Sequence, residues 1–290
     1  MNDKKLVTLG SISFHLKEQH DFNWLTFLGE VFCVFDEQDS GNICFGIEID
    51  GAKRFVKYAG AKTIEYTGQP KDAVERLKRS VHLYEVLKHP YLINLIDHFQ
   101  VDEGYALIFD WFDGECLHSH WSFPPPQKYT HPDSPFFRYK QLPIEIRLES
   151  LKCIFEFHVY AEKQNYVAVD FYDGSILYNF ETNSTRICDI DFYKKKPFKN
   201  TMGRLWGSSR FMSPEEFELG AEIDERTNVF NMGAIAFGLL GGELDRSILK
   251  WDAGSELYEV AMKAVQKGKM DRYSTVEEFF FEWESAMTLL

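Results

Sequence analysis

The sequence predicts an α+β protein with a small, β-rich first lobe that carries one helix and a larger, mainly helical second lobe. Three observations favour this class. Alternating apolar and polar residues, interrupted by turn residues, fill positions 31–60, which is typical of antiparallel strands. Apolar residues recur at helical spacing in 70–95 and 144–165. At 290 residues the chain can bury a large core, as one bilobal unit or as two small domains.

Composition excludes several classes of function. The net charge of −13 argues against binding to nucleic acid or to an anionic membrane, because both need a basic face. No apolar run approaches the roughly 20 residues that span a membrane, and the N-terminus lacks the apolar segment of a signal peptide. The five cysteines are isolated, so we expect neither structural zinc nor disulfides, and a reducing, cytoplasmic location.

The first 112 residues contain five predicted strands. Residues 1–23 are mixed and polar, and we expect them to pack on the first lobe as an extension. Ser-Gly-Asn and Asp-Gly-Ala turns separate three predicted strands, and a further strand pair follows the helix. The helix has an apolar stripe and stops at the His-Pro pair at 89–90. The predicted strands are 31–38, 43–50, 54–60, 95–102 and 105–112.

The second part opens with an unusual segment. Residues 118–143 hold six of the ten prolines together with many aromatic residues, which predicts an ordered insertion or an exposed loop. A docking surface, or a metal site at His118, His120 and His131, is the alternative interpretation. Residues 144–165 then form a helix with a buried apolar side.

The most informative stretch runs from 166 to 215. Two short apolar runs, 175–178 and 186–188, read as strands on either side of a polar turn, and aspartates lie close to both. Carboxylates at the ends of paired strands can converge on one point, which suits Mg²⁺ because this ion takes hard oxygen ligands and shares them with phosphate. The stretch closes with GSSRFMSPEE at 207–216, followed by the apolar helix 225–240.

These pieces occur in the order of protein-kinase motifs: a catalytic loop, a metal-binding aspartate and a Pro-Glu motif. Over roughly residues 24–288 the chain therefore resembles the protein kinase-like superfamily, as an atypical Ser/Thr protein kinase of the bacterial, eukaryotic-like type. The resemblance implies transfer of phosphate from ATP to Ser or Thr of a protein substrate, with Mg²⁺ or Mn²⁺. It also implies an N-lobe at 1–112, a C-lobe at 113–290 and a nucleotide between them.

The resemblance assigns nucleotide contacts in the N-lobe. Of the three glycines in the family's phosphate loop only the last is present, and Phe55 replaces the small residue that faces adenine. Counting back from the His-Pro pair, the glutamate that pairs with the lysine falls at Ser80. Glu75 and Glu85 are each five residues away and point off that face, so either the register differs or the ion pair is missing, and Glu75 is the predicted substitute. The implied contacts are Gly41 at the phosphates, Ile43 at adenine, Lys57 at the phosphates, and the hinge backbone from Asp110 to Phe112, after Phe109 as gatekeeper.

In the C-lobe, Asp170 takes the place of the residue that accepts the proton of the substrate hydroxyl. Val169 replaces the arginine that contacts a phosphorylated activation loop, which implies that the protein is not activated in that way. Ser175 replaces the metal-binding asparagine, and Asp173 is a compensating ligand. The metal-binding aspartate is Asp189 with Asp191 as a helper, or Asp191 itself.

The resemblance extends through the end of the activation segment. Ser208 takes the position that contacts the catalytic aspartate, and Glu215 pairs with Arg272 in a structural ion pair. Asn228 replaces a family aspartate, which implies weaker anchoring of the catalytic loop. Residues 192–206 are basic, as expected of a solvated loop or of a match for an acidic substrate.

Two other functions remain open. A pseudokinase, binding nucleotide or protein without efficient transfer, fits Phe55 and Ser175. A small-molecule phosphotransferase would share the lysine and the two aspartates, but such enzymes usually lack the Pro-Glu segment that this chain has.

Overall fold

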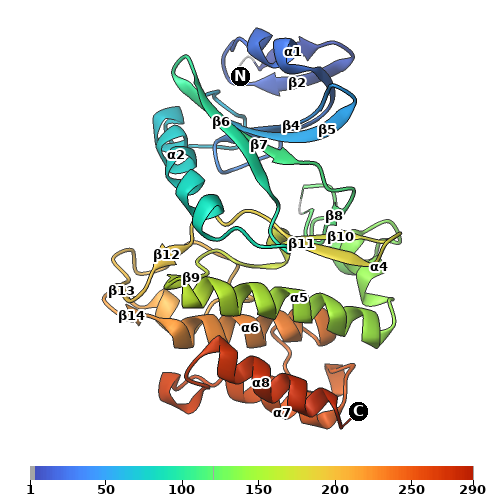
Figure 1. Ribbon diagram of the computed structural model, residues 1–290, viewed down its shortest axis with the longest axis vertical. Helices are drawn as coiled ribbons and strands as arrows, with labels where there is room; N and C mark the ends of the chain where they lie inside the picture. The colour runs from blue at the N-terminus through green and yellow to red at the C-terminus, as the bar shows by residue number, and fades with distance from the viewer. Residues whose placement is uncertain (1–3, 120, 290) are drawn as a thin grey trace. The chain divides into compact units, whose positions relative to one another are not determined.

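The structure is a computed structural model that describes residues 4–119 and 121–289. The chain divides into two compact units, one formed by residues up to 88 together with 93–112, the other by residues 89–92 and those from 113 onward. The first unit is rich in strands and the second is mainly helical (Figure 1). The predicted fold class, a bilobal α+β protein, is confirmed.

Unit one is built on a five-stranded antiparallel sheet with the order β3-β4-β5-β7-β6. Short turns join β4 to β5 and β6 to β7, with Asp50 and Gly51 at positive φ in the first of them. This is the arrangement expected of an Asp-Gly hairpin turn. The strands are β3 (Glu30–Phe35), β4 (Asn42–Ile49), β5 (Ala52–Ala59), β6 (Leu95–Val101) and β7 (Gly104–Asp110).

An N-terminal extension covers one face of this sheet. It consists of the hairpin β1 (Lys5–Leu9) and β2 (Ile12–Leu16), followed by α1 (Asn23–Leu28). Apolar side chains of the extension and of the sheet form one buried cluster, in which Phe14 and Phe22 lie in edge contact with Phe45. The extension therefore completes the core of unit one.

Helix α2 (Pro70–Val86) packs on strands β5 and β7 of the sheet (Figure 1). Proline at its first position suits a helix start, because its missing N–H has no partner there. The buried side includes Leu77 and Tyr84, and the Tyr84 ring contacts Phe109 on β7 at 4.9 Å. The helix ends shortly before the His-Pro pair, as the sequence predicts.

Unit two is dominated by helices. Helix α6 is buried along almost its whole length, as its continuous apolar sequence predicts, and packs against α5, α7 and α8 (Figure 1). No helix of the described residues is long and apolar enough to span a bilayer. The α-helices are α3 (Gln127–Thr130), α4 (Pro135–Lys140), α5 (Ile144–Lys163), α6 (Glu225–Leu240), α7 (Ser255–Ala264) and α8 (Val276–Met287).

Short strands carry the loops of unit two. Strand β8 (Glu115–Cys116) joins the hairpin β10–β11 in the order β11-β10-β8, and two further pairs are β9–β12 and β13–β14. The strands are β9 (Tyr166–Val167), β10 (Ile176–Asn179), β11 (Ser184–Ile187), β12 (Lys194–Lys195), β13 (Phe198–Lys199) and β14 (Glu222–Ile223). Single 3₁₀ turns lie at Asp173–Ser175, Pro214–Phe217, Ile248–Lys250 and Lys269–Asp271.

Candidate active site

Hairpin β10–β11 places Ser175 and Asp189 at the same end of a strand pair. Its register sets Ile176 opposite Ile187. One residue further out, the N–H of Cys188 donates to the carbonyl oxygen of Ser175 at 2.9 Å. Asp189 is the next residue along the chain, so the same hairpin fixes the backbone at both positions.

Strand pair β9–β12 brings Asp170 and Asp191 to one end in a similar way. Val167 lies opposite Lys194. Asp170 follows Val167 and Asp191 precedes Lys194 by the same number of residues, so in an antiparallel pair both leave at the same end. Because residues 188–193 link β11 to β12, the ends of the two strand pairs that carry Asp170, Ser175, Asp189 and Asp191 belong to one part of unit two.

The backbone at the two main aspartates is unusual. Asp170 has φ of 66° and Asp189 has φ of 55°, both in the left-handed region. Aspartate enters this region more readily than most residues, but the conformation still carries some strain. Such positions gather at functional sites, which makes these two aspartates stronger candidates than sequence position alone does.

The electrostatic field also places these carboxylates together. Burial raises the pKa of the Tyr172 phenol, and the charges of Asp189 and Asp170 raise it further. The pKa of Tyr193 is raised well above its ordinary value by burial and then by Cys188, Asp170 and Asp189. Both phenols therefore lie within the negative field of the same two aspartates and stay neutral.

The donor set fits a divalent cation that shares its ligands with phosphate. The Ser175 hydroxyl is fully buried and has no hydrogen-bond partner among the described residues. It lies beside Asp189, which is exposed, and the hairpin leads on to Asp191, which is buried. No group of three or more His, Cys, Asp or Glu side chains within 4–119 and 121–289 could hold a metal ion alone. Phosphate and water would have to complete the shell around Mg²⁺ or Mn²⁺.

The end of the activation segment lies against the loop that carries Asp170. A Cβ added to Gly207 would lie 3.6 Å from the Cα of Asp170. Ser208 comes next, and its hydroxyl accepts a hydrogen bond from Nε of Arg210 at 3.1 Å. Its carbonyl oxygen accepts from the N–H of Phe211 at 2.9 Å. Ser208 is therefore held in a tight turn beside the candidate base.

The Pro-Glu motif is fixed by a buried ion pair. The guanidinium of Arg272 donates to the two carboxylate oxygens of Glu215 at 2.7 and 3.0 Å. The hydroxyl of Thr227 donates to the same carboxylate at 2.9 Å. Burial alone would raise the pKa of Glu215, but the hydrogen bonds and charge of Arg272 lower it. The pair joins the Pro-Glu motif to the segment between α7 and α8.

In unit one, Lys57 is almost fully buried on strand β5, directly opposite Leu107 of β7 and Cys44 of β4. Phe55 is two residues away and so faces the same side of the sheet. Its ring contacts Phe109 at 6.3 Å. The side of the sheet that presents the lysine is thus aromatic.

The structure contradicts the prediction that Ile43 contacts a nucleotide together with Lys57. Ile43 pairs with Tyr58, and both side chains lie in the core beneath the N-terminal extension. Strand side chains alternate between faces, so Ile43 points away from the face of Lys57. Cys44, opposite Lys57, takes the place that the sequence count gave to Ile43. A count that is wrong by one residue is enough to exchange the two faces.

Gly41 has a structural reason to be glycine. Its φ is 79°, and an added Cβ would lie 2.6 Å from the ring of Tyr66. The guanidinium of Arg76 on α2 donates to the carbonyl oxygen of the neighbouring Ser40. The loop between β3 and β4 is therefore tied to the rest of unit one, and its glycine is packed against an aromatic ring.

The hinge residues end strand β7. Asp110 accepts a hydrogen bond from Asn94 at 2.8 Å and pairs with Arg54 at 3.3 Å, while its own N–H donates to the carbonyl oxygen of Asn94. Phe112 is the last residue of unit one. Side-chain contacts thus hold the start of the segment whose backbone the sequence assigns to adenine.

The helix position predicted for a glutamate carries none. The Ser80 hydroxyl is buried and donates to the carbonyl oxygen of Leu77 at 2.8 Å. Glu75 is exposed and forms an ion pair with Arg79 one turn further along α2 at 3.4 Å. Glu75 therefore lies on the solvent side of the helix, which does not favour it as the substitute partner of Lys57.

Comparison with known proteins identifies the family of the chain. Residues 51–279, more than half of the chain, match the family described as the protein kinase domain. This chain belongs to the protein kinase family. The matched region begins after β3, β4 and the loop between them. The glycine-poor loop of this kinase therefore lies outside the part that the family match covers.

One relative of this kinase is calcium-dependent protein kinase 5 of Plasmodium falciparum (isolate 3D7). The two are 27% identical over 171 residues, which is 58% of this chain and 27% of that protein. The aligned part thus spans about a quarter of the relative's length.

A buried charge network next to the catalytic loop of this kinase was not predicted from the sequence. Nζ of Lys128 lies 2.5 Å from Asp173 and 2.8 Å from Glu243. The guanidinium of Arg210 donates to the same two carboxylates at 2.6 to 2.8 Å. The hydroxyl of Tyr129 donates to Glu243 at 2.8 Å. The network joins the insertion, the catalytic loop, the activation segment and the loop after α6; it is called the Lys128 network below.

This network corrects the suggestion that Asp173 is a spare metal ligand. Its side chain is fully buried and both oxygens are held by cations. Burial would raise the pKa of Asp173, but the hydrogen bonds from Arg210 and the charge of Lys128 lower it to about 2. The carboxylate is therefore ionised, and both of its oxygens already bind the cations of Lys128 and Arg210.

Only a weak sequence signal pointed to this network. Lys128 stands in a proline-rich segment that reads as surface, and residues 128, 173, 210 and 243 are far apart in the chain. The metal alternative for this segment fell on His118, His120 and His131. His120 lies outside the described residues, and His118 lies 3.9 Å from Asp173. A charged residue inside an aromatic, proline-rich stretch was the one available hint that the segment is anchored.

Asn228 anchors the catalytic loop of this kinase by three hydrogen bonds. Its amide oxygen accepts from the N–H of Ala168 at 2.8 Å. Its amide nitrogen donates to the carbonyl oxygen of Tyr166 at 3.0 Å and to Glu162 at 3.2 Å. Glu162 also accepts from the N–H of Val276 at 3.0 Å. Burial raises the pKa of Glu162 to about 7 despite these donors and the charge of Lys196.

Val169, which stands at the position of the arginine in the family's catalytic loop, packs among apolar side chains. It is buried in a cluster with Val167, Leu205, Met212 and Ile223, against which Phe192 and Phe198 also pack. Residues of the catalytic loop and of the activation segment share this cluster. The activation segment is thus held to the catalytic loop by buried apolar surface at this position.

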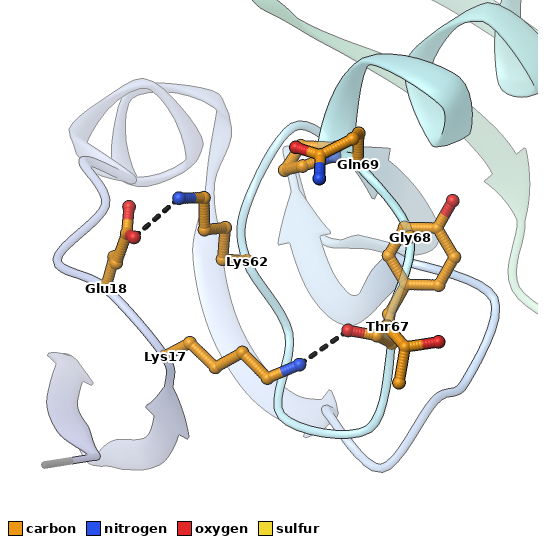
Figure 2. Close-up of a pocket in the computed structure, with 8 residues that line it drawn as sticks. Lys17, Glu18, Lys62, Thr67, Gly68 and Gln69 are labelled. Atoms are coloured by element: carbon orange, nitrogen blue, oxygen red, sulfur yellow. Dashed lines mark hydrogen bonds and ion pairs between the residues drawn. The ribbon is translucent and has the colours of Figure 1, made fainter. Parts of the chain in front are cut away.

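Figure 2 shows a polar pocket of about 330 Å³ in unit one, between the N-terminal extension and the loop that leads into α2. Lys62 forms an ion pair with Glu18 at 2.5 Å, and Lys17 donates to the carbonyl oxygen of Tyr66 at 2.5 Å. None of the predicted site residues lines it. Its two lysines therefore tie the extension to the loop.

Proposed function

We propose that this kinase-family chain transfers the γ-phosphoryl group of ATP to a Ser or Thr hydroxyl of a protein substrate. The observation that carries the proposal is the convergence of Asp170, Ser175, Asp189 and Asp191 at the ends of two short strand pairs. Phosphoryl transfer needs mainly positioning and neutralisation of charge, so a small set of correctly placed groups suffices.

Each residue has a defined role in the proposal. Asp170 orients the substrate hydroxyl and accepts its proton as the oxygen bonds to phosphorus and the bond to the ADP oxygen breaks. Asp189 and Ser175 hold the metal ion, with Asp191 as a helper, and Lys57 contacts the phosphates. A bound Mg²⁺ or Mn²⁺ neutralises the charge of the phosphates. The hinge backbone from Asp110 to Phe112 and the loop at Gly41 contact the nucleotide.

Specificity for Ser and Thr is part of the proposal. Ser208 lies next to Gly207, which packs against the Asp170 backbone, and its hydroxyl is held by Arg210. A hydroxyl fixed there supports the orientation of Asp170 toward an aliphatic alcohol. We also propose a reducing, cytoplasmic location, because all five cysteines are free thiols.

A catalytically weak pseudokinase is the second candidate, favoured by one observation. The loop between β3 and β4 has one glycine, and Tyr66 fills the space that its missing side chain leaves. Close approach of bare backbone to phosphate is therefore restricted in this loop. Such a protein would bind nucleotide or a partner protein without rapid transfer.

The test is transfer of radiolabelled phosphate from ATP with Mg²⁺ or Mn²⁺ to a generic protein acceptor. We expect transfer by the wild type and a loss of at least about a hundredfold in Asp170→Ala and Asp189→Asn. Asp50→Asn is the matched control for Asp189→Asn, because Asp50 is likewise an exposed aspartate at positive φ but lies in the hairpin turn between β4 and β5. Transfer that survives both active-site changes would overturn the assignments. Nucleotide-dependent thermal stabilisation without transfer would favour the pseudokinase.

A further inference from the structure

The activation segment exposes an unusual patch of one arginine and three large apolar side chains. We call Met202, Arg204, Trp206 and Phe217 the Arg204 patch. All four are exposed, and Trp206 is 53% exposed. Arginine and aromatic residues are enriched where proteins bind partners. A patch of this composition on a loop beside the candidate base is therefore a candidate binding surface.

The backbone beneath the patch is firmly held. The buried amide of Asn200 donates to the carbonyl oxygen of Gly203 at 2.7 Å and accepts from the N–H of Met202 at 3.0 Å. The N–H of Leu205 donates to the carbonyl oxygen of Glu216 at 2.9 Å, and its side chain is buried in the apolar cluster of Val169. With Leu205 pointing inward, its neighbours Arg204 and Trp206 are left exposed.

The patch lies close to the catalytic loop. The guanidinium of Arg204 donates to the carbonyl oxygen of Gly207 at 2.9 Å and to that of Leu205 at 3.3 Å. Gly207 in turn packs against Asp170. A substrate whose hydroxyl reaches Asp170 would therefore bring its neighbouring residues to the Arg204 patch.

Arg204 keeps an uncompensated positive charge. Its guanidinium hydrogen-bonds carbonyl oxygens and lies 5.8 Å from the ring of Phe217, and no carboxylate of a described residue lies within ion-pair distance of it. Lys199, on the other side of the Asn200 turn, is also exposed, although Glu222 lies opposite it in the β13–β14 register.

Two carboxylates beside the catalytic loop, those of Asp173 and Glu243, are not available to attract a cationic side chain. Asp173 and Glu243 are neutralised inside the protein by Lys128 and Arg210. A cationic side chain of a substrate would find these carboxylates already paired. An anionic side chain would find the unpaired guanidinium of Arg204.

We propose that the Arg204 patch selects substrates that carry an anionic side chain, beside an apolar one, next to the phosphorylated Ser or Thr. This inference rests on the proposed function and names its substrate class. The planar guanidinium binds carboxylate or phosphate through two parallel hydrogen bonds, so glutamate, aspartate and a phosphorylated residue share the required chemistry. Trp206, Phe217 and Met202 contact the apolar neighbour.

The test measures binding of peptides that cannot be phosphorylated. Fluorescent peptides carry alanine at the acceptor position, a leucine nearby, and Glu, phosphoserine or Lys at the flanking positions, and fluorescence anisotropy gives Kd for the full chain. We expect the Glu or phosphoserine peptide to bind more tightly than the Lys peptide. Arg204→Gln should weaken the anionic peptides by up to about fivefold. Arg79→Gln, at another exposed arginine, on α2, should leave Kd unchanged.

Two further measurements sharpen the result. Trp206→Ala should weaken the Glu and Lys peptides by the same factor, since it removes the apolar contact. Added salt should reduce the preference for the anionic peptides. Preference for phosphoserine over Glu would identify a previously phosphorylated substrate as the source of the anion.

The proposal is overturned if the Lys peptide binds as tightly as the anionic ones, if Arg204→Gln changes nothing, or if no peptide binds measurably. Because these peptides cannot accept phosphate, the outcome does not depend on catalysis. Absent phosphoryl transfer would overturn the proposed function while leaving a measured charge preference in place.

Discussion

At the scale of single residues, the clearest feature of unit two is a lysine that is almost completely buried. Lys128 retains 1% of its accessibility and is surrounded by two carboxylates and by the rings of Phe136 and Tyr129. A buried ammonium is tolerated only when it is paired and hydrogen-bonded. Its role is therefore to neutralise Asp173 and Glu243 from a segment that the sequence reads as a loop.

Replacing this lysine should be far more harmful than replacing a paired surface lysine. Lys128→Met leaves two buried carboxylates facing one guanidinium, so we expect a loss of about 3 to 5 kcal/mol in the free energy of unfolding. Lys163→Met is the control, because Lys163 pairs with Glu277 in the open and should lose less than about 1 kcal/mol. Urea denaturation of both variants measures the difference. Equal losses would show that the Lys128 network does not stabilise the fold.

At the scale of elements, Glu162 links three helices. It lies near the end of α5, and its carboxylate accepts from Asn228 on α6 and from the N–H of Val276 at the start of α8. Its pKa is raised from 4.5 to about 7 by burial. The folded protein therefore holds this proton at a pH at which the unfolded chain has released it.

The sign of the resulting pH dependence follows. Because the pKa of Glu162 is raised, the free energy of unfolding falls as the pH rises from about 4.5 to about 7. The loss is absent below about pH 4.5 and reaches on the order of 3 kcal/mol at about pH 7. Glu162→Gln should remove this pH-dependent loss. The free energy of unfolding of the wild type relative to the variant should therefore fall between about pH 4.5 and 7 and stay constant above about pH 7. Urea denaturation of both proteins across this pH range measures the difference in the free energy of unfolding. The pKa of Glu216 is also raised to about 7, but Glu216 is present in both proteins and its contribution cancels. A difference that is flat with pH would show that Glu162 is ionised throughout.

At the scale of the whole molecule, the family match and the folded core of unit one do not coincide. The match begins at residue 51, yet the core includes Phe14 and other residues of the extension. Phe14→Ala should therefore lower the free energy of unfolding by about 3 to 5 kcal/mol. Phe27, in the same extension but 87% exposed, should tolerate alanine with little change. Thermal unfolding of the pair tests this, and similar melting temperatures would mean that the extension is dispensable.

Sequence reasoning succeeded where local patterns decide the outcome. Strand alternation and turn residues predicted the sheet, and the periodicity of apolar residues predicted α2 and α5. The order of motifs around Asp170 and Glu215 predicted the family. These signals lie within short windows of the chain.

Sequence reasoning failed where the outcome depends on strand register or on contacts between residues that are far apart in the chain. Counting residues from Gly41 put Ile43 on the wrong face of the sheet. Such a count can be wrong by one residue, and because side chains of a strand alternate between faces, an error of one residue moves a side chain to the opposite face. Asp173 was taken for a metal ligand because its cationic partners come from residues 128 and 210. Glu75 was taken as the substitute partner of Lys57, but it is exposed and pairs with Arg79 on the solvent side of α2.

The Lys128 network has a consequence for how this chain can change over generations. Losing any one of Lys128, Asp173, Arg210 or Glu243 leaves an unmatched buried charge, whereas replacing all four by apolar residues of similar volume can be nearly neutral. The four positions should therefore be inherited as a set. Among descendants of a common ancestor, a chain that has shed the proline-rich insertion should also have exchanged the aspartate, the arginine and the glutamate, and intermediates with three of the four should be rare.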